Sequence, residues 1–282
     1  DATTNTLRRG ATLGISDRHA VHGVLLESIF QWTRRRDSDL AKGTSPLEIR
    51  PGLWQGNFFS DQRGRNQRYH IAQTVAWETK AGGLTHRLKA GAEFDHVISN
   101  LWLDRRAYKQ FGEAGDLKSS VTFAGPNSAG IRNREYGLFL LDRIVFNPQL
   151  QIELGMRFDR ENVVGRNNVG PRAAFSFLPL RTDRSKVSGG VGLFYDNISL
   201  VNLQLPRMQR RYTISYEAGV SAPAATPTDV RVSRDLQNPS GVHWNLEWEH
   251  QWAPRWVSRI DYIQKKGRDQ VRLAALPNVN GF

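Results

Sequence analysis

The sequence predicts an all-β protein, specifically a partial antiparallel transmembrane β-barrel of roughly ten to twelve strands from a larger barrel. Three observations predict this class. Apolar and polar residues alternate along segments of about ten residues or more, the length that a tilted strand needs to cross a bilayer. Tight turns alternate with long connections. No stretch approaches the roughly 18 apolar residues of a spanning helix.

Alternation is clearest where polar residues separate five apolar ones: Leu150, Ile152, Leu154, Met156 and Phe158. In a strand, such sets face opposite sides. A first apolar row consists of Val24, Leu26, Phe30 and Trp32. Further strands are expected, in chain order, over Tyr69–Lys80, Leu88–Asp95, Arg134–Phe146, Leu150–Asp159, Val169–Leu178, Lys186–Asp196, Trp244–Glu249 and Trp256–Lys265.

The connections between these strands come in two sizes. Tight turns are expected at Ala81–Gly83, Asn147–Gln149 and Ala253–Arg255. Long irregular loops are expected over Asp37–Asn57, Asp104–Arg132 and Ala218–Asp229, the last of which contains two prolines and cannot be a central strand. Short turns at one end and long loops at the other are typical of outer-membrane barrels.

A β-sandwich is the alternative, since its strands also alternate. Strand length argues against it, because ordinary strands have about five to six residues. Aromatic residues are also expected near strand ends, where an interfacial girdle would place them: Trp32, Trp77, Tyr136, Trp252 and Trp256.

Composition sets broad limits on function. The 282 residues include 39 Lys and Arg against 27 Asp and Glu, a net charge of +12 that favours polyanions such as nucleic acid or anionic lipid headgroups. The absence of cysteine excludes disulfides, thiolate zinc sites and cysteine nucleophiles. A mean hydropathy of −0.52 does not exclude a barrel, because only every second side chain faces lipid.

Several motifs together resemble the TonB-dependent outer-membrane receptors. Tyr136–Arg143, the turn at Asn147-Pro148 and Leu154–Asp159 resemble the strand, turn and strand of a hairpin in that family. Gly170–Phe175 resembles the following strand, and Gly189–Asp196 is similar to a strand of the Oar-like subgroup, whose members carry a carboxypeptidase-regulatory-like module. The resemblance extends from about His86 to Gly267, with Leu141 standing where glutamine is usual.

This resemblance implies a function and partners. The family has a 22-stranded barrel, an N-terminal plug domain and a TonB box, and it imports scarce ligands across the Gram-negative outer membrane. We therefore expect residues 1–282 to be a fragment of the barrel domain, with no plug domain and no TonB box, and Phe282 to be a cut point. The implied partners are the protein's own plug domain, the TonB complex, outer-membrane lipid and lipopolysaccharide, and an unknown small ligand.

Candidate site residues follow from the polar side of the alternation. Residues that would face the lumen and contact the plug are Glu93, Asp95, Glu153, Arg157 and Asp159. Two carboxylate pairs, Glu93 with Asp95 and Glu153 with Asp159, are compatible with glycoside hydrolysis, but lumen polarity explains them equally well. His243, Glu247 and Glu249 share one strand face as a weak metal candidate, for which wetted lumen residues are the alternative. We expect no enzymatic activity, no cofactor and no bound metal.

Basic runs are the remaining feature. Arg34–Arg36, Arg210-Arg211 and Lys265-Lys266 with Arg268 are expected at strand ends and loops, either contacting lipopolysaccharide phosphates or simply solvated. They are not interleaved with stacking aromatics on one face, which argues against a nucleic-acid partner. Two alternative functions remain open: a passive porin-like or adhesive barrel, and a soluble basic β-protein that binds polyanions.

Overall fold

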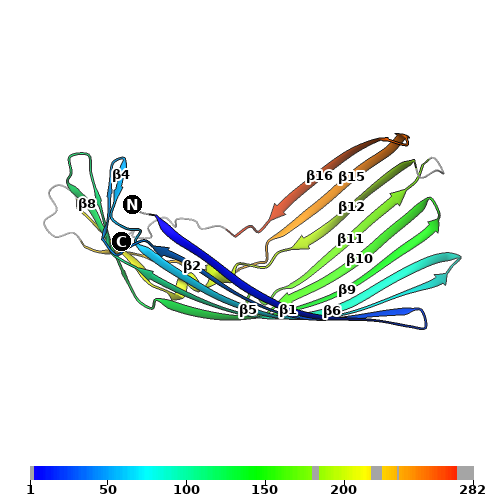
Figure 1. Cartoon of the computed structure of the whole chain (residues 1–282), viewed down its shortest axis with the longest axis horizontal. Helices are drawn as coiled ribbons and strands as arrows, with labels where there is room; N and C mark the ends of the chain where they lie inside the picture. The colour runs from blue at the N-terminus through cyan, green and yellow to red at the C-terminus, as the bar shows by residue number, and fades with distance from the viewer. Residues whose placement is uncertain (1–2, 180–183, 217–223, 234, 272–282) are drawn as a thin grey trace.

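The computed structural model describes residues 3–179, 184–216, 224–233 and 235–271, so the expectation for Phe282 lies outside the described residues. Within them, ten long strands form one antiparallel sheet in which each strand pairs with the next one along the chain. The sheet is bent into a trough (Figure 1). Its strands are β1 (Thr4–Val21), β2 (Val24–Ala41), β5 (Ser60–Ala81), β6 (Leu84–Arg105), β9 (Ser128–Asn147), β10 (Leu150–Glu161), β11 (Asn167–Phe177), β12 (Ser185–Tyr195), β15 (Ser240–Ala253) and β16 (Trp256–Arg268).

The expected all-β antiparallel architecture is confirmed, and most strands are longer than the alternation indicated. β5 has 22 residues and begins at Ser60, nine residues before the expected start at Tyr69. β1 was not expected, because Arg9 interrupts its apolar row between Leu7 and Ala11.

Tight turns close the hairpins at one end of the sheet. The loops at His22-Gly23 and Gly82-Gly83 have positive φ at both residues, as the two-residue hairpin turn that fits strand twist requires. Asn147 stabilises the next turn, because its Oδ1 accepts hydrogen bonds from the backbone N–H groups of Gln149 (2.8 Å) and Leu150 (2.9 Å).

The expected irregular loops are in part a second sheet, which corrects the sequence analysis. Six short strands from three connections pair in the order β14-β13-β8-β7-β3-β4, at the opposite end from the tight turns (Figure 1). They are β3 (Leu47–Arg50), β4 (Leu53–Gln55), β7 (Tyr108–Phe111), β8 (Leu117–Ala124), β13 (Arg210–Ser215) and β14 (Thr226–Thr228). Pro227 lies in β14 at the edge, as the exclusion of a central strand predicted.

Each sheet carries a small buried cluster. The six-stranded sheet, which we call the loop sheet, has a cluster in which Leu47, Tyr108 and Val121 pack together with Phe59 and Phe123. A second cluster forms where the connection between β12 and β15 folds back through α1 (Leu200–Gln204) and the 3-10 turn η1 (Leu205–Arg207). There Met208 packs against Leu101 and Leu103 of β6. The Nε2 of Gln204 donates to Ser99 Oγ at 2.9 Å. Both clusters tie long connections to the sheet.

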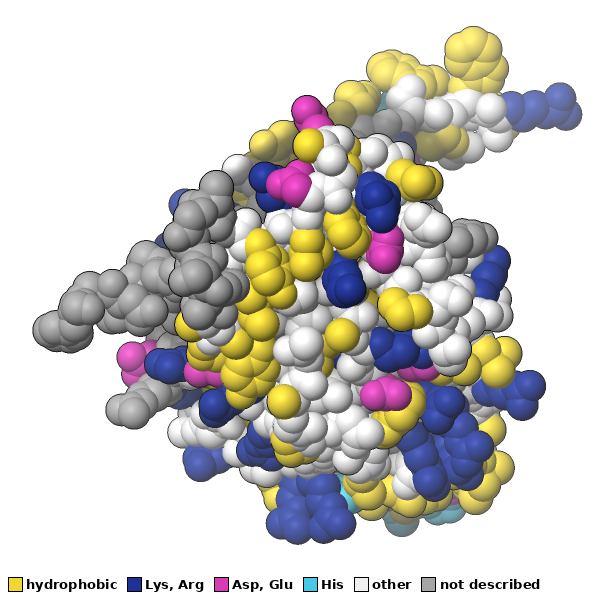
Figure 2. All heavy atoms as spheres, turned by 90° about the vertical axis from the view of Figure 1, so that its left-hand side faces the viewer, with side chains coloured by type: hydrophobic (Ala, Val, Ile, Leu, Met, Phe, Trp, Pro, Cys, Tyr) yellow, Lys and Arg dark blue, Asp and Glu magenta, His cyan; other side chains and the backbone are white. Residues whose placement is uncertain are grey.

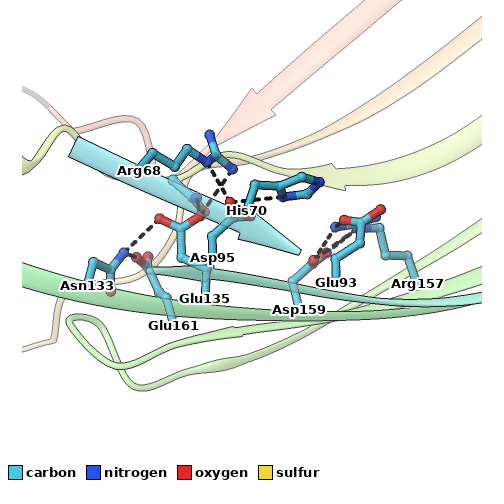
Figure 3. Close-up of polar contacts among 10 residues, drawn as sticks. Arg68, His70, Glu93, Asp95, Asn133, Glu135, Arg157, Asp159 and Glu161 are labelled. Carbon is cyan, nitrogen blue, oxygen red and sulfur yellow. Dashed lines mark hydrogen bonds and ion pairs between the residues drawn. The ribbon is translucent and has the colours of Figure 1, made fainter. Parts of the chain in front are cut away.

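The two faces of the long sheet differ in the way a membrane wall requires. Leu154 and Met156 are 49% and 56% exposed on the convex face, together with Leu138 and Leu140 of the neighbouring strand. The alternating polar residues point to the concave face, as Figure 3 shows for β6, β9 and β10. The apolar row is therefore not packed inside a compact globule.

Two expectations about position are wrong. Trp32 and Tyr136 lie well inside β2 and β9, because these strands continue for eight or more residues past them toward the loop sheet. For the same reason Arg34–Arg36 lie within β2, whereas Lys265, Lys266 and Arg268 lie at the end of β16, as expected. Trp252 and Trp256 do flank a tight turn as expected. In the described part of the chain, no helix has the length and apolarity needed to cross a membrane.

Candidate functional site: a polar cluster on the concave face

A guanidinium clasp joins two strands that are not neighbours. Arg157 of β10 donates from Nε to both carboxylate oxygens of Asp159 at 2.9 Å. Its Nη2 reaches across β9 to Glu93 Oε2 of β6 at 2.7 Å (Figure 3). The crossing point is Gly137, where a Cβ atom would lie only 2.7 Å from the guanidinium. The clasp therefore depends on a residue without a side chain.

A second set of contacts converges on Asp95, which is buried. Its Oδ1 accepts a hydrogen bond from Arg68 Nε at 2.6 Å and lies 2.9 Å from His70 Nδ1. Arg68 also places Nη2 3.8 Å from Glu135 Oε2. Arg68 and His70 come from β5 and Asp95 from β6, so these contacts hold adjacent strands in register.

Glu161 forms a third group with asparagine side chains. The Nδ2 of Asn133 donates to Glu161 Oε2 at 2.6 Å and to Glu135 Oε1 at 3.0 Å. Asn238 donates to the other oxygen of Glu161 and accepts from Asn168 at 2.9 Å. Asn238 lies just before β15, so its hydrogen bond to Glu161 attaches the end of the long connection between β12 and β15 to the long sheet.

Strand register explains why these residues meet. His70, Asp95, Glu135 and Glu161 are successive cross-strand partners on β5, β6, β9 and β10. Side chains in one such row share a face of the sheet. The cluster surrounds a pocket of about 320 Å³. Six carboxylates line this pocket against three guanidinium groups, so it is acidic within a basic chain: Glu93, Asp95, Glu135, Asp159, Glu161 and Asp196 against Arg68, Arg157 and Arg160.

The structure brings together four of the five predicted site residues. Glu93, Arg157 and Asp159 form the clasp, and Asp95 lies two residues from Glu93 on the same strand face. Glu153 lies apart, nearer the tight turns, where it accepts hydrogen bonds from Arg143 at 2.8 and 3.1 Å.

Sequence reasoning missed the partners of these residues: Arg68, His70, Asn133, Glu135 and Glu161. Arg68 and Asn133 stood one residue before the expected strands, and Glu161 two residues after one. Extending the polar row by two residues at each strand end would have found all three.

The arrangement does not favour the chemical alternatives. Within the described ranges, no group of three or more His, Asp or Glu side chains is placed to hold a metal ion. His243 stacks on Phe194 at 4.9 Å, and Glu247 accepts a hydrogen bond from Arg259 at 2.8 Å, so these side chains have separate partners. Glu93 and Asp95 are each bound by an arginine, whereas a hydrolytic pair needs one carboxyl group as a proton donor.

Solved structures share this fold. The outer membrane transporter YddB from Escherichia coli superposes with a TM-score of 0.68 at 17% identity, covering 93% of this chain and 34% of that one. A variant of the ferric enterobactin receptor PfeA from Pseudomonas aeruginosa, in complex with enterobactin, gives 0.67 at 18% identity, covering 98% and 37%. The siderophore receptor PirA from Acinetobacter baumannii gives 0.63 at 13% identity, covering 94% and 35%. The chain thus spans about a third of the length of these proteins.

No curated protein matches the sequence. The family described as "TonB dependent receptor-like, beta-barrel" matches residues 3–281, nearly the whole chain, although the Oar-like subgroup stays a prediction. These proteins are receptors and transporters of the Gram-negative outer membrane, not enzymes. The chain belongs to the TonB-dependent receptor-like β-barrel family.

Proposed function

We propose that this chain forms about half the barrel wall of a plugged outer-membrane receptor, which imports a scarce ligand with energy supplied through TonB. The observation that carries the proposal is the acidic cluster on the concave face, held by the Arg157 clasp. Among the described residues, strands β1 and β16 lie at the two edges of the long sheet and each pair with a single neighbour, an arrangement that further strands of a larger barrel would complete.

The concave face would line the lumen and contact the plug. Its excess of carboxylates favours a basic surface on the plug, because opposite charges fix the register of two docked surfaces. Glu93, Asp95, Arg157 and Asp159 would make these contacts, and Glu153 would bound the passage nearer the periplasmic turns. The plug domain and the TonB complex are thus the proposed protein partners.

The ligand and the lipid contacts are finer parts of the proposal. The similar structures include a siderophore receptor and a receptor holding enterobactin, so an iron-chelate is a reasonable first ligand class to screen. The convex face would contact outer-membrane lipid and lipopolysaccharide through its exposed apolar rows and basic residues.

Planar-bilayer conductance of the full-length protein tests plug closure. We expect the wild type to show no steady current. The Arg157→Gln and Asp159→Asn variants should show intermittent current, because the clasp no longer holds its charges where they would contact the plug. Glu247→Gln, also on the concave face and paired with Arg259, is the matched control and should remain closed.

Barrel assembly must be measured in the same variants. Arg157 and Asp159 are 30% and 33% exposed, and ion pairs of that exposure contribute only about 1 kcal/mol or less. Both variants should therefore fold and keep the heat-dependent gel mobility of an intact barrel. Loss of assembly would refute the assignment to the plug. A steady wild-type current would favour the passive porin instead.

Energised import has a separate test. A strain that depends on the ligand for growth should fail equally when the gene for this protein or the gene for TonB is deleted. Growth that survives loss of TonB would contradict the energised mechanism.

A further inference from the structure

Two glutamates and four asparagines meet on the concave face, where the long strands end nearest the loop sheet. The glutamates are Glu135 of β9 and Glu161, the last residue of β10. The asparagines come from β9, from β11 and from both ends of the connection between β12 and β15: Asn133, Asn168, Asn197 and Asn238. We call these six residues the asparagine–glutamate cluster, part of which Figure 3 shows.

Glu161 is a buried carboxylate without a basic partner. Its exposed fraction is only 3%, and its two oxygens accept hydrogen bonds from the side-chain amides of Asn133 and Asn238. Among the described residues, no arginine, lysine or histidine forms an ion pair with it. A carboxylate that is removed from water needs a compensating charge, and neutral amides supply none.

The second carboxylate increases this imbalance. Asn133 Nδ2 lies 2.6 Å from Glu161 Oε2 and 3.0 Å from Glu135 Oε1, so both carboxylates face the same atom. In the described structure, the ion-pair partner of Glu135 is the Arg68 guanidinium at 3.8 Å, which binds Asp95 more closely at 2.6 Å. Two negative charges this close repel each other, and a cation between them would remove the repulsion.

A buried amide oxygen is the observation that points to a metal ion. Asn133 is 1% exposed, and its Oδ1 has no hydrogen-bond donor in the described part of the chain. The oxygen and nitrogen of an amide occupy nearly the same space, so a half-turn of this amide aims Oδ1 at both carboxylates. Oδ1 would then lie about 3 Å from an oxygen of each glutamate, as neighbouring ligands do around a cation bound at about 2.3–2.6 Å.

The types of donor atom identify the class of ion. All are oxygens, from two carboxylates, from carboxamides and from the Asp196 backbone carbonyl, which lies 3.3 Å from Asn238 Nδ2. Ca²⁺ takes six to eight such ligands in a flexible arrangement, and two carboxylates balance its charge, whereas Mg²⁺ demands a nearly ideal octahedron. A set of three His, Asp or Glu side chains, which the described residues lack, is not required, because amide and carbonyl oxygens supply the remaining ligands.

The cluster lies on the side of the membrane where the medium supplies Ca²⁺. A strand crosses a bilayer in about nine to eleven residues, so Glu161, at the far end of β10 from the tight turn, reaches the outer boundary. The long connections of such barrels are extracellular. Figure 2, viewed from the loop end, shows acidic side chains scattered among arginine and lysine on the outer surface. That surface does not favour a competing site for divalent cations.

We propose that the asparagine–glutamate cluster binds Ca²⁺ and thereby fastens both ends of the connection between β12 and β15 to the wall. Asn197 donates to Glu135 at 2.8 Å, and Asn238 donates to Glu161. The same connection supplies β13 and β14 of the loop sheet. The proposal rests on the proposed function only for the extracellular placement of this end of the wall.

Isothermal titration calorimetry of the full-length protein, stripped with EDTA and kept in detergent, measures binding of CaCl₂ and MgCl₂. Glu161→Gln removes one charge at nearly constant volume, and Glu247→Gln is the matched control, because it removes the same charge from the same face. We expect Ca²⁺ to bind Glu161→Gln at least roughly tenfold more weakly than the wild type, and the control within about twofold. Equal affinities in all three proteins, equal losses in both variants, or Mg²⁺ bound as tightly as Ca²⁺ would overturn the proposal.

Asn133→Asp distinguishes an ion site from a cluster held by hydrogen bonds alone. A third carboxylate should tighten Ca²⁺ binding by about tenfold, because charge count sets the affinity of such sites. In EDTA the variant should have a lower Tm than the wild type, since buried like charges repel, and Ca²⁺ should restore it. A variant that is equally destabilised in EDTA and in Ca²⁺ would refute the site.

Hydrogen exchange locates the effect within the protein. Ca²⁺ should slow exchange in α1 and β13 of the wild type, leave β2 unchanged, and have no effect on α1 or β13 in Glu161→Gln. Protection that persists in that variant would assign the ion to another place and overturn the proposal. These measurements need neither TonB nor the imported ligand, so a protein that imports its ligand without binding Ca²⁺ here would lose only this site.

Discussion

Gly137 controls the geometry of the clasp at the scale of single residues. It lies on β9 between Glu93 and Asp159, which are its cross-strand partners on either side. The Arg157 guanidinium passes over this position, and a Cβ atom there would also lie 3.2 Å from Asp159 Oδ1. A methyl group would therefore push the guanidinium off Glu93 while leaving the backbone pairing intact.

Gly137→Ala should reproduce the effect of Arg157→Gln. We expect intermittent conductance from the full-length protein, with a free energy of unfolding lowered by about 1 kcal/mol or less, because only partly exposed ion pairs are lost. Gly64→Ala is the matched control, since no atom lies within 4 Å of a Cβ at that strand position. An alanine at Gly137 that left the barrel closed would show that the clasp does not position the plug.

The sequence could predict which face each of these residues occupies, but not which residues touch. Alternation alone assigned Glu93, Arg157 and Asp159 to the polar side of their strands. Arg157 and Glu93 are 64 positions apart in the sequence, and their contact depends on the register of β6, β9 and β10. Register is set by strand pairing along the whole sheet, which no single segment encodes.

At the scale of elements, the loop sheet is a small folding unit with its own core. Leu47 of β3 and Val121 of β8 are essentially fully buried, and β3 pairs in parallel with β7 from a different connection. Alternation could not predict this sheet, because its strands have three to eight residues and their neighbours come from other loops.

Leu47→Ala should loosen the loop sheet and spare the wall. Deleting a buried leucine side chain costs about 2–5 kcal/mol, and here the cavity lies within a unit outside the long sheet. Hydrogen exchange should accelerate in β3, β7 and β8 but not in β5 or β6. Leu53→Ala, at a position 55% exposed on β4, is the control and should leave exchange unchanged. Faster exchange throughout β5 and β6 would show that the two sheets unfold together.

At the scale of the whole molecule, the apolar residues of the long sheet lie mainly on its outside. Leu154, Met156, Leu138 and Leu140 are each about half exposed on the convex face, whereas ion pairs and hydrogen bonds occupy the concave face. A protein folded in water would place these rows in reverse. The sequence could predict this inversion in part, since strand length and turn asymmetry favoured a membrane wall over a sandwich.

Charge placed on each face of β10 distinguishes the membrane wall from a basic β-protein that binds polyanions in water. Leu154→Lys should cost about 2–4 kcal/mol, because it puts an ammonium group against hydrocarbon near the middle of the wall. Gln151→Lys, on the concave face of the same strand, should cost little, since that side chain meets water. Folding of the full-length protein into phospholipid vesicles, followed by gel mobility and urea titration, measures the difference. If both lysines were tolerated equally, and the protein stayed monodisperse without detergent, the convex face would not contact lipid and the membrane assignment would fail.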